Sequence, residues 1–327
     1  MESIKFSIII PVKSINDYIR ETVPHIQALE NRNWELIILP NELEPSEWVD
    51  KRIKIISSGR VGPAAKRDLG AINAKGDILV FLDDDSYPSP KLLDIAAPYF
   101  EDVEIVALGG PAITPFDDGF WQKVSGAVFL SKYSGGNPER YLPIGMAKQV
   151  DDWPSVNLMV RRHEFQAIGG FNSPYWPGED TKLCLDLIEK TNKKIIYVPN
   201  MKVWHHRRSG ILTHLKQVGA YGLHRGYFAK VYPKTSRKIM YFAPPAFFIF
   251  TIASLFIWKY PFEIKVVIGL IWMVYVAVLI KAYSDISAHE KSIVAFCAIF
   301  FTIATHQWYG YCFIKGFFTN NLKSRLR

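Results

Sequence analysis

The chain has 327 residues, of which 49% are hydrophobic and 21% charged, and its formal net charge is +8. This hydrophobic content excludes a disordered protein, which could not bury enough apolar surface to offset the entropy lost on ordering. Three widely spaced cysteines exclude a disulfide scaffold and give no zinc-binding spacing, which fits a reducing compartment. The positive charge points to a polyanionic partner, and its position along the chain indicates which kind.

The charge is distributed unevenly. Residues 1–201 have a net charge of −6, residues 202–238 carry nine Lys and Arg with no acid, and residues 239–327 have a net charge of +5. Residues 1–201 are acidic and contain no recognisable nucleic-acid-binding motif, which argues against nucleic acid as the partner. The basic stretch precedes apolar segments and so indicates anionic lipid or a diphosphate-bearing ligand, although a positive flank without a specific ligand has the same composition.

The N-terminal third predicts strands alternating with helices. The expected strands cover residues 6–11, 34–39, 52–56, 77–82 and 104–109, and the expected helices cover 16–30, 64–74 and 92–100. Such alternation predicts an α/β fold, with a mainly parallel sheet and helices on both faces. Ligands of such sheets bind beyond the carboxyl ends of the strands, so the residues just after each strand become the candidates for function.

The C-terminal part predicts helices at or in a membrane. Residues 211–231 mix apolar and basic residues, as an interfacial helix does. Three apolar segments of 18, 15 and 22 residues follow at 241–258, 266–280 and 293–314. About 20 residues cross a bilayer, so the first and third segments reach the required length and the second needs its flanks. Buried helices of a soluble core are the alternative.

The topology of these segments is left open by the charges. Residues 1–10 contain no leader-like apolar region, so the N-terminal part is expected in the cytosol. Three spans would then place Lys323, Arg325 and Arg327 outside, against the positive-inside tendency. Either the third segment is re-entrant or interfacial, or the tail is an exception.

An acidic triplet follows the predicted strand at residues 77–82. Asp83, Asp84 and Asp85 come directly after its last apolar residues, where three carboxylates repel one another. A hard divalent cation would relieve that repulsion, with Asp83 and Asp85 presenting oxygens to it. The alternative is an acidic turn or a cap for the next helix.

Two further motifs contain groups that could take part in chemistry. Glu179 and Asp180 follow Gly178 at a predicted helix start, where a carboxylate can act as a general base or can simply cap the helix. His205 and His206 precede two arginines, so they could bind a metal or phosphate or form a solvated basic face.

A glycine- and proline-containing loop enters the predicted helix at residues 64–74. It begins at Gly59 and leads to Lys66 and Arg67, which could approach a nucleotide phosphate. The loop lacks the Walker pattern and is weak evidence by itself.

The order of these motifs resembles the family 2 glycosyltransferases with the GT-A fold. A strand ending in Pro is followed by a Lys-Arg-Asp loop, the Asp triplet, Gly169-Gly170-Phe171, Gly178-Glu179-Asp180 and a downstream His, across roughly residues 4–210. The joint order is far more specific than any single motif. The C-terminal part resembles the membrane-attached subset that assembles exopolysaccharides and lipid-linked oligosaccharides.

The resemblance implies a role for each candidate residue. Asp83 and Asp85 would hold Mg²⁺ or Mn²⁺ against the donor diphosphate, with His205, or less favourably His206, as a further ligand. Asp180 would be the catalytic base, with Glu179 supporting it. Other residues would line the nucleotide-sugar site: Pro11, Val12, Lys66, Arg67 and Asp84, the last at the donor sugar or ribose.

The chain also departs from the family pattern. Leu39-Pro40-Asn41-Glu42 stands where the family usually has Asp-Asp, so Glu42 or Asn41 would have to read the donor nucleotide, of UDP or GDP type. Asp68 stands where Asn is common. The Gln-x-x-Arg-Trp motif of processive synthases is absent, as is the pattern of polyprenyl-phosphate sugar synthases.

These observations predict a metal-dependent, inverting glycosyltransferase at the cytosolic face of the cell membrane. Its acceptor is expected to be a polyprenyl-linked saccharide. Transfer to polyprenyl phosphate itself, or a non-catalytic scaffold with a degenerate domain, are the alternatives. The expected organisation is a GT-A domain over residues 1–210, a basic interfacial segment over 211–238, and a membrane domain over 239–327.

Overall fold

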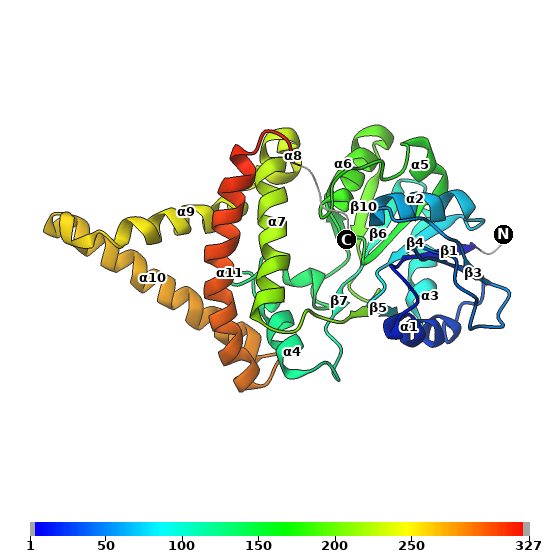
Figure 1. Cartoon of the computed structure of the whole chain (residues 1–327), viewed down its shortest axis with the longest axis horizontal. Helices are drawn as coiled ribbons and strands as arrows, with labels where there is room; N and C mark the ends of the chain where they lie inside the picture. The colour runs from blue at the N-terminus through cyan, green and yellow to red at the C-terminus, as the bar shows by residue number, and fades with distance from the viewer. Residues whose placement is uncertain (1–3, 323–327) are drawn as a thin grey trace. The chain divides into compact units, whose positions relative to one another are not determined.

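The structure, a computed structural model, describes residues 4–322, and the chain separates into two units (Figure 1). Residues 4–115 and 139–206 form unit 1, while Phe116–Pro138 and Arg207–Leu322 form unit 2. The predicted three-part division stays a prediction, and the structure adds that an internal segment groups with the C-terminal part. The tail cations Lys323, Arg325 and Arg327 lie outside the described residues.

Unit 1 contains a mixed, mainly parallel sheet of eight described strands in the order β3-β2-β1-β4-β9-β6-β10-β8. The apolar runs predicted as strands occupy its centre, and β9 and β8 run opposite to the others. The sequence pattern did not predict β9. The strands are β1 (Phe6–Pro11), β2 (Trp34–Leu39), β3 (Ile53–Ile55), β4 (Ile78–Leu82), β6 (Ile105–Gly109), β8 (Lys148–Val150), β9 (Asn157–Arg161) and β10 (Lys194–Tyr197).

Helices cover both faces of this sheet, as strand–helix alternation predicts (Figure 1). Successive strand residues point to opposite faces, so Ile8 and Ile10 pack against α1 while Ile9 packs on the side of α2. Phe165 and Leu183 extend that second core. The helices of unit 1 are α1 (Asp17–Gln27), α2 (Pro63–Asn73), α3 (Leu92–Ala96), α5 (Arg162–Ala167) and α6 (Glu179–Thr191).

A second, smaller sheet lies at the carboxyl end of β4. Its described strands are ordered β5-β11-β7, where β5 is Ser86–Pro88, β11 is Val203–His205 and β7 is Ala112–Ile113. Because β5 follows the acidic triplet directly, β11 brings the distant His205 alongside it. The predicted helix at 92–100 is interrupted: α3 gives way to a 3₁₀ helix at Ala97–Glu101 that contains Pro98, which has no backbone N–H to donate.

Unit 2 is helical in its described part. The predicted basic helix is confirmed as α7 (Ile211–Val231) and packs along α11 (Ser292–Phe318). The other helices of unit 2 are α4 (Phe120–Ala127), α8 (Pro233–Ser236), α9 (Ile239–Ser254) and α10 (Phe262–Ser287). Val128–Leu130 and Ile257–Lys259 form 3₁₀ turns.

The first apolar segment forms a shorter helix than expected, whereas the second is extended by its flanks as expected. The first forms α9, which has 16 residues, whereas the second forms α10, which has 26. The chain leaves the α-helix after Ser254, and Pro261 caps a new helix that continues through polar residues as far as Ser287. As a result α10 and α11, rather than α9 and α11, are long and apolar enough to cross a membrane.

Candidate active site

The acidic triplet lies between two buried strands. Asp83 follows β4 directly, and the Ser86 side chain holds the turn by donating to the Asp83 carbonyl at 2.9 Å and accepting from the Asp83 N–H at 3.1 Å. Asp85 is 4% exposed, whereas Asp83 and Asp84 are half-buried. The strand ends therefore fix the backbone of all three carboxylates at the edge of the sheet where ligands bind.

His205 faces these carboxylates because β11 pairs with β5. The register places His205 opposite Ser86, and its Nε2 lies 3.1 Å from Asp85 Oδ1. One ligand atom from each of Asp83, Asp85 and His205 lies within 4.8 Å of the others. The structure thus brings together the three residues predicted to bind metal.

His206 points elsewhere. Its Nε2 lies 2.9 Å from Glu21 Oε2 on α1, and its ring packs against Tyr18 at a centroid distance of 4.9 Å. Neighbouring residues of a strand project to opposite sides, which accounts for the difference between the two histidines. The sequence left the choice between them open, and the geometry favours His205.

The donor set of Asp83, Asp85 and His205 fits a divalent cation. Two carboxylates supply hard oxygen ligands, and a neutral imidazole nitrogen is compatible with Mn²⁺ as well as with Mg²⁺. The close approach of Asp83 and Asp85 is a repulsion that a cation between them would relieve.

Arg67 joins this cluster to the second carboxylate motif. Its guanidinium is 3% exposed and makes ion pairs of 2.6 Å with Asp83 and 3.0 Å with Glu179. The residue lies on α2, so one side chain connects the triplet after β4 with the start of α6. A planar guanidinium can serve two carboxylates at once, which a lysine ammonium does less well.

Glu179 and Asp180 begin α6 after Gly178, whose φ of +108° favours a residue without a side chain. Burial, together with the charge of Asp180, raises the pKa of Glu179, which is 4% exposed. Burial and the charge of Asp152 raise the pKa of Asp180. Because Glu179 is committed to Arg67 and Asp180 is less buried, Asp180 is the better placed of the two to accept a proton.

The sequence reasoning missed Asp152. Its carboxylate is 6% exposed, accepts hydrogen bonds from Thr181 Oγ1 at 3.2 and 3.3 Å, and lies 3.4 Å from Arg140. The backbone N–H of Ser155, a few residues further on, donates to Asp180 at 3.3 Å. The adjacent acids of Asp151-Asp152-Trp153 were the signal that the sequence offered.

Lys66 holds the ends of two strands together. Its ammonium is buried and donates to the carbonyl oxygens of Val12 and Leu39 and to Asn41 Oδ1, the last two at 3.1 and 2.7 Å. Burial lowers its pKa to about 8. Pro11 and Val12 therefore form part of a fixed floor at the carboxyl ends of β1 and β2. The predicted contact of Lys66 or Arg67 with a phosphate stays a prediction.

A cavity of about 660 Å³ opens beside this floor. Glu42 lines it and pairs with Arg60 at 3.4 Å, with both side chains largely exposed. The remaining lining residues come from the loops after β1 and β2: Lys13, Ser14, Asn41, Leu43 and Glu44. Asp84 lies close by through a 3.1 Å hydrogen bond from Asn16, which also caps α1.

Asp68, where the family commonly has Asn, fixes the Gly-Gly-Phe turn. Its carboxylate accepts hydrogen bonds from the backbone N–H groups of Phe171 at 2.8 Å and Asn172 at 3.2 Å. A Cβ on Gly170 would lie 2.5 Å from Asp68 Oδ1, and Gly170 has a φ of +73°. Only an acceptor is needed there, so Asp can replace Asn.

These features agree with a comparison to protein families. The family described as glycosyl transferase family 2 matches residues 7–162, which contain the acidic triplet, Lys66, Arg67 and Asp152. This segment of the chain is therefore similar to glycosyltransferase family 2. The predicted resemblance to this family is thereby confirmed for that segment, and the fold has the predicted mainly parallel sheet with flanking helices.

Curated relatives match part of the chain. A pre-mycofactocin glycosyltransferase of Mycobacterium tuberculosis is 29% identical over 161 residues, which cover 49% of this chain and 33% of the relative. An uncharacterized glycosyltransferase of Rickettsia conorii is 31% identical over 105 residues, covering 30% of this chain and 17% of the relative. The chain thus spans a third or less of the length of these relatives.

A solved structure is also similar. It is that of GalNAc-T7 with UDP, GalNAc and Mn²⁺, at a TM-score of 0.48 and 16% identity, covering 72% of this chain and 52% of that one.

Proposed function

We propose that the chain transfers a sugar from a nucleotide-sugar donor to a hydroxyl group of a lipid-linked saccharide, with inversion at the anomeric carbon. The observation that carries the proposal is Arg67, which ties the candidate metal ligand Asp83 to Glu179 beside the candidate base. A site with a cation-binding half and a proton-accepting half in contact suits group transfer from a diphosphate.

In unit 1, different residues would bind the nucleotide and the metal. The floor at Pro11 and Val12 and the cavity beside Glu42 would hold the nucleotide, of UDP or GDP type, with Asp84 at the ribose or sugar. Asp83, Asp85 and His205 would hold Mg²⁺ or Mn²⁺, which when bound offsets the negative charge of the diphosphate.

Asp180 would accept the proton of the acceptor hydroxyl. The hydroxyl oxygen then bonds to the anomeric carbon, and the bond from that carbon to the diphosphate oxygen breaks, releasing the nucleoside diphosphate. Attack from the side opposite the leaving group inverts the anomeric centre. The charge of Arg67 lowers the pKa of Asp180 and of Glu179, and so favours the carboxylate form of the base.

Membrane attachment is supported by unit 2. Two of its helices, α10 and α11, have the length and composition of membrane spans, and the basic α7 and α8 region precedes them. A lipid-linked acceptor would be presented at such a surface, which is why we assign the reaction to the cytosolic membrane face.

The test is transfer from a panel of nucleotide sugars to lipid-linked acceptors, with and without Mg²⁺ or Mn²⁺. Asp83→Ala and Asp180→Asn should each lower the rate by about 100-fold or more. Asp186→Asn is the matched control, because it removes a carboxylate of the same helix α6 that pairs with Lys182 and Lys190.

Full activity of either site variant would contradict the assignment. Failure of the wild-type chain to bind any nucleotide sugar in calorimetry with metal would favour the non-catalytic scaffold. Turnover with bare polyprenyl phosphate but not with a lipid-linked sugar would replace the acceptor class while keeping the site.

A further inference from the structure

Helices α7 and α11 pack side by side and in parallel. His214 Nε2 lies 2.8 Å from Thr305 Oγ1 near one end, and Lys230 donates to the Thr319 carbonyl near the other. Between these contacts the backbones touch: a Cβ on Gly226 would lie 2.0 Å from the Phe313 carbonyl oxygen. Contact this close along most of α7 and the C-terminal half of α11 makes them one element, and neither can change its depth in a membrane alone.

The charges of α7 decide where that element can lie. Lys216, Arg225 and Lys230 are spaced along the length of α7. The Arg225 guanidinium stacks over Tyr241 at 4.6 Å, at the level where α7 meets Phe313. If α11 crossed the bilayer, α7 would have to cross with it and take these cations into the hydrocarbon, which is costly.

The exposed surface of α11 is one-sided. One face is buried, including Ala298, Thr302 and Phe313. Large apolar side chains that are 41% to 75% exposed recur at helical spacing on another face: Ile293, Phe296, Phe300, Trp308, Tyr311 and Phe318. A single exposed apolar stripe on a helix packed against a basic neighbour is the arrangement of a helix that lies in the headgroup layer.

Helix α10 differs from α11 in each of these respects. Only 6% of its most apolar stretch is buried, against 39% for α11, so α10 is exposed on nearly all sides. A helix that is apolar all round requires an apolar environment all round, such as lipid acyl chains. Its 26 residues reach about 39 Å, enough to cross a hydrocarbon layer of about 30 Å.

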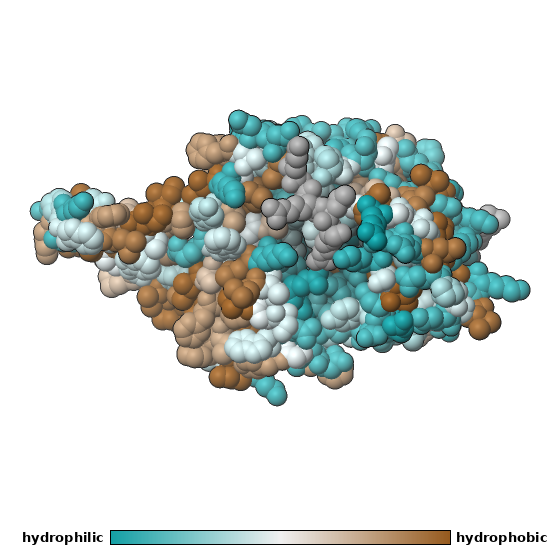
Figure 2. Space-filling view, viewed as in Figure 1, coloured by the Kyte–Doolittle hydropathy of each residue, from teal (hydrophilic) through white to brown (hydrophobic). Residues whose placement is uncertain are grey.

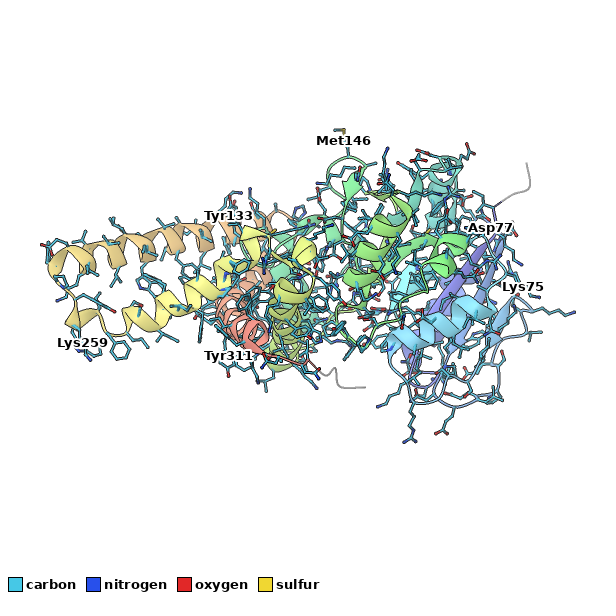
Figure 3. The ribbon with its side chains drawn as sticks, turned by 90° about the horizontal axis from the view of Figure 1, so that it is seen from above. Lys75, Asp77, Tyr133, Met146, Lys259 and Tyr311 are labelled. Carbon is cyan, nitrogen blue, oxygen red and sulfur yellow. The ribbon has the colours of Figure 1, made fainter. Side chains whose placement is uncertain are left out.

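The α9–α10 hairpin carries its charges at its ends. Residues 239–258 and 266–280 contain no Lys, Arg, Asp or Glu. Lys259, Glu263 and Lys265 lie around the tip, and Lys281 and Asp285 pair near the other end of α10. Figure 2 shows hydrophobic side chains along this projecting hairpin with hydrophilic ones at its tip, and Figure 3 places Lys259 there.

We propose that the α9–α10 hairpin crosses the bilayer and that α11 stays with α7 along the surface of entry. The occupant of the exposed hairpin surface is the acyl-chain layer of the membrane. Residues 207 and 322 then lie on the same side, and the hairpin tip lies on the opposite side. The proposal rests on the membrane attachment in the proposed function and not on the transfer reaction.

The test is labelling of single cysteines in the full-length chain in sealed membrane vesicles of both orientations, with a maleimide that does not cross membranes. Asp17→Cys, at a side chain that is 100% exposed, defines the side of unit 1. The wild-type chain gives the background, since Cys184 and Cys312 are buried and Cys297 is half-buried.

Asn320→Cys, just after α11, should react from the same side as Asp17→Cys, and Lys259→Cys should react only from the opposite side. Labelling of Asn320→Cys from the opposite side would overturn the proposal, because α11 would then be a span. Labelling of Lys259→Cys from the unit 1 side, or only after detergent, would overturn it as well, because the hairpin would not cross.

Two further measurements separate this failure from failure of the proposed function. Release of the chain by alkaline carbonate would contradict membrane insertion and with it both the topology and the membrane part of the function. The expected labelling pattern in a chain that transfers no sugar would support the topology while contradicting the reaction. All three substituted side chains are exposed, so loss of folding is not expected.

Discussion

The site contains two clusters of carboxylate side chains, which share the same chemistry but lie in different local environments. Asp83 and Asp85 lie in a turn between two strands and face an imidazole, with Asp83 half-exposed. Asp180 lies at a helix start with buried Glu179 and Asp152 around it, and its pKa is raised. The first setting suits a pair of charged ligands for a cation, and the second suits a group that takes up a proton.

Arg67 connects the two settings, so its removal should have the largest effect. Arg67→Met leaves buried Glu179 without a counter-charge and should lower the free energy of unfolding by about 3–5 kcal/mol. It should abolish transfer too. Chemical denaturation and the transfer assay measure the two losses.

Arg60→Met is the control for stability, because Arg60 pairs with Glu42 at side chains that are 84% and 78% exposed. An exposed pair of this kind contributes about 0–1 kcal/mol. Equal destabilisation by the two substitutions would show that the buried bridge has no special role.

The cation-binding half predicts the next effect. Asp85→Asn keeps the shape of a side chain that is 4% exposed but removes its charge, so transfer should fall about 100- to 1,000-fold. The remaining activity should respond weakly to added Mn²⁺ or Mg²⁺. A variant with normal activity and normal metal response would exclude this carboxylate as a ligand.

Substitution of the two histidines tests the cation-binding half of the site further. His205→Ala should raise the Mn²⁺ concentration needed for half-maximal activity by about tenfold or more, because its Nε2 faces the carboxylates. His206→Ala should change it far less, since His206 pairs with Glu21 on α1. The reverse order in a metal titration would reassign the ligand.

The proton-accepting half predicts the smallest effect, a shift of the pH profile. Asp180 must be ionised to accept a proton, so the rate should fall as the pH drops through its raised pKa. Asp152→Asn removes the neighbouring charge that raises this pKa, while Arg140 and Arg67, which lower it, remain. The acid limb should therefore move to lower pH.

The measurement is the pH dependence of kcat/KM for the wild type and the variant. At a pH above both acid limbs the rate should change little, because Asp180 is ionised there in both. An acid limb that does not move, or moves to higher pH, would show that Asp152 does not act on the base.

Much of unit 1 could be predicted from local pattern. The runs Phe6–Pro11 and Trp34–Leu39 became strands with the expected ends, because a short apolar run rich in isoleucine and closed by Pro favours a buried strand. Strand β9 was missed, since it lies between β4 and β6 with reversed direction and no helix alternation marks it. The sequence predicted which residues could bind the metal, but it did not predict how those residues are arranged in space.

The choice between His205 and His206 shows what the local sequence pattern could not predict. Both lie in one basic run, and only the pairing of β11 with β5 turns His205 towards Asp85. Asp152 is similar: its closeness to Asp180 comes from the fold of the segment between β8 and β9, which the sequence pattern left unassigned.

By itself the sequence determined an α/β domain with an acidic triplet at a strand end, a basic belt and apolar C-terminal segments, because hydrophobic period and charge are properties of neighbouring residues. The tertiary structure decided which of those residues meet. It joined Asp83 to Glu179 through Arg67, and it packed α7 against α11 through glycines. Such contacts depend on strand register and on close backbone approach between distant segments, which local pattern does not encode.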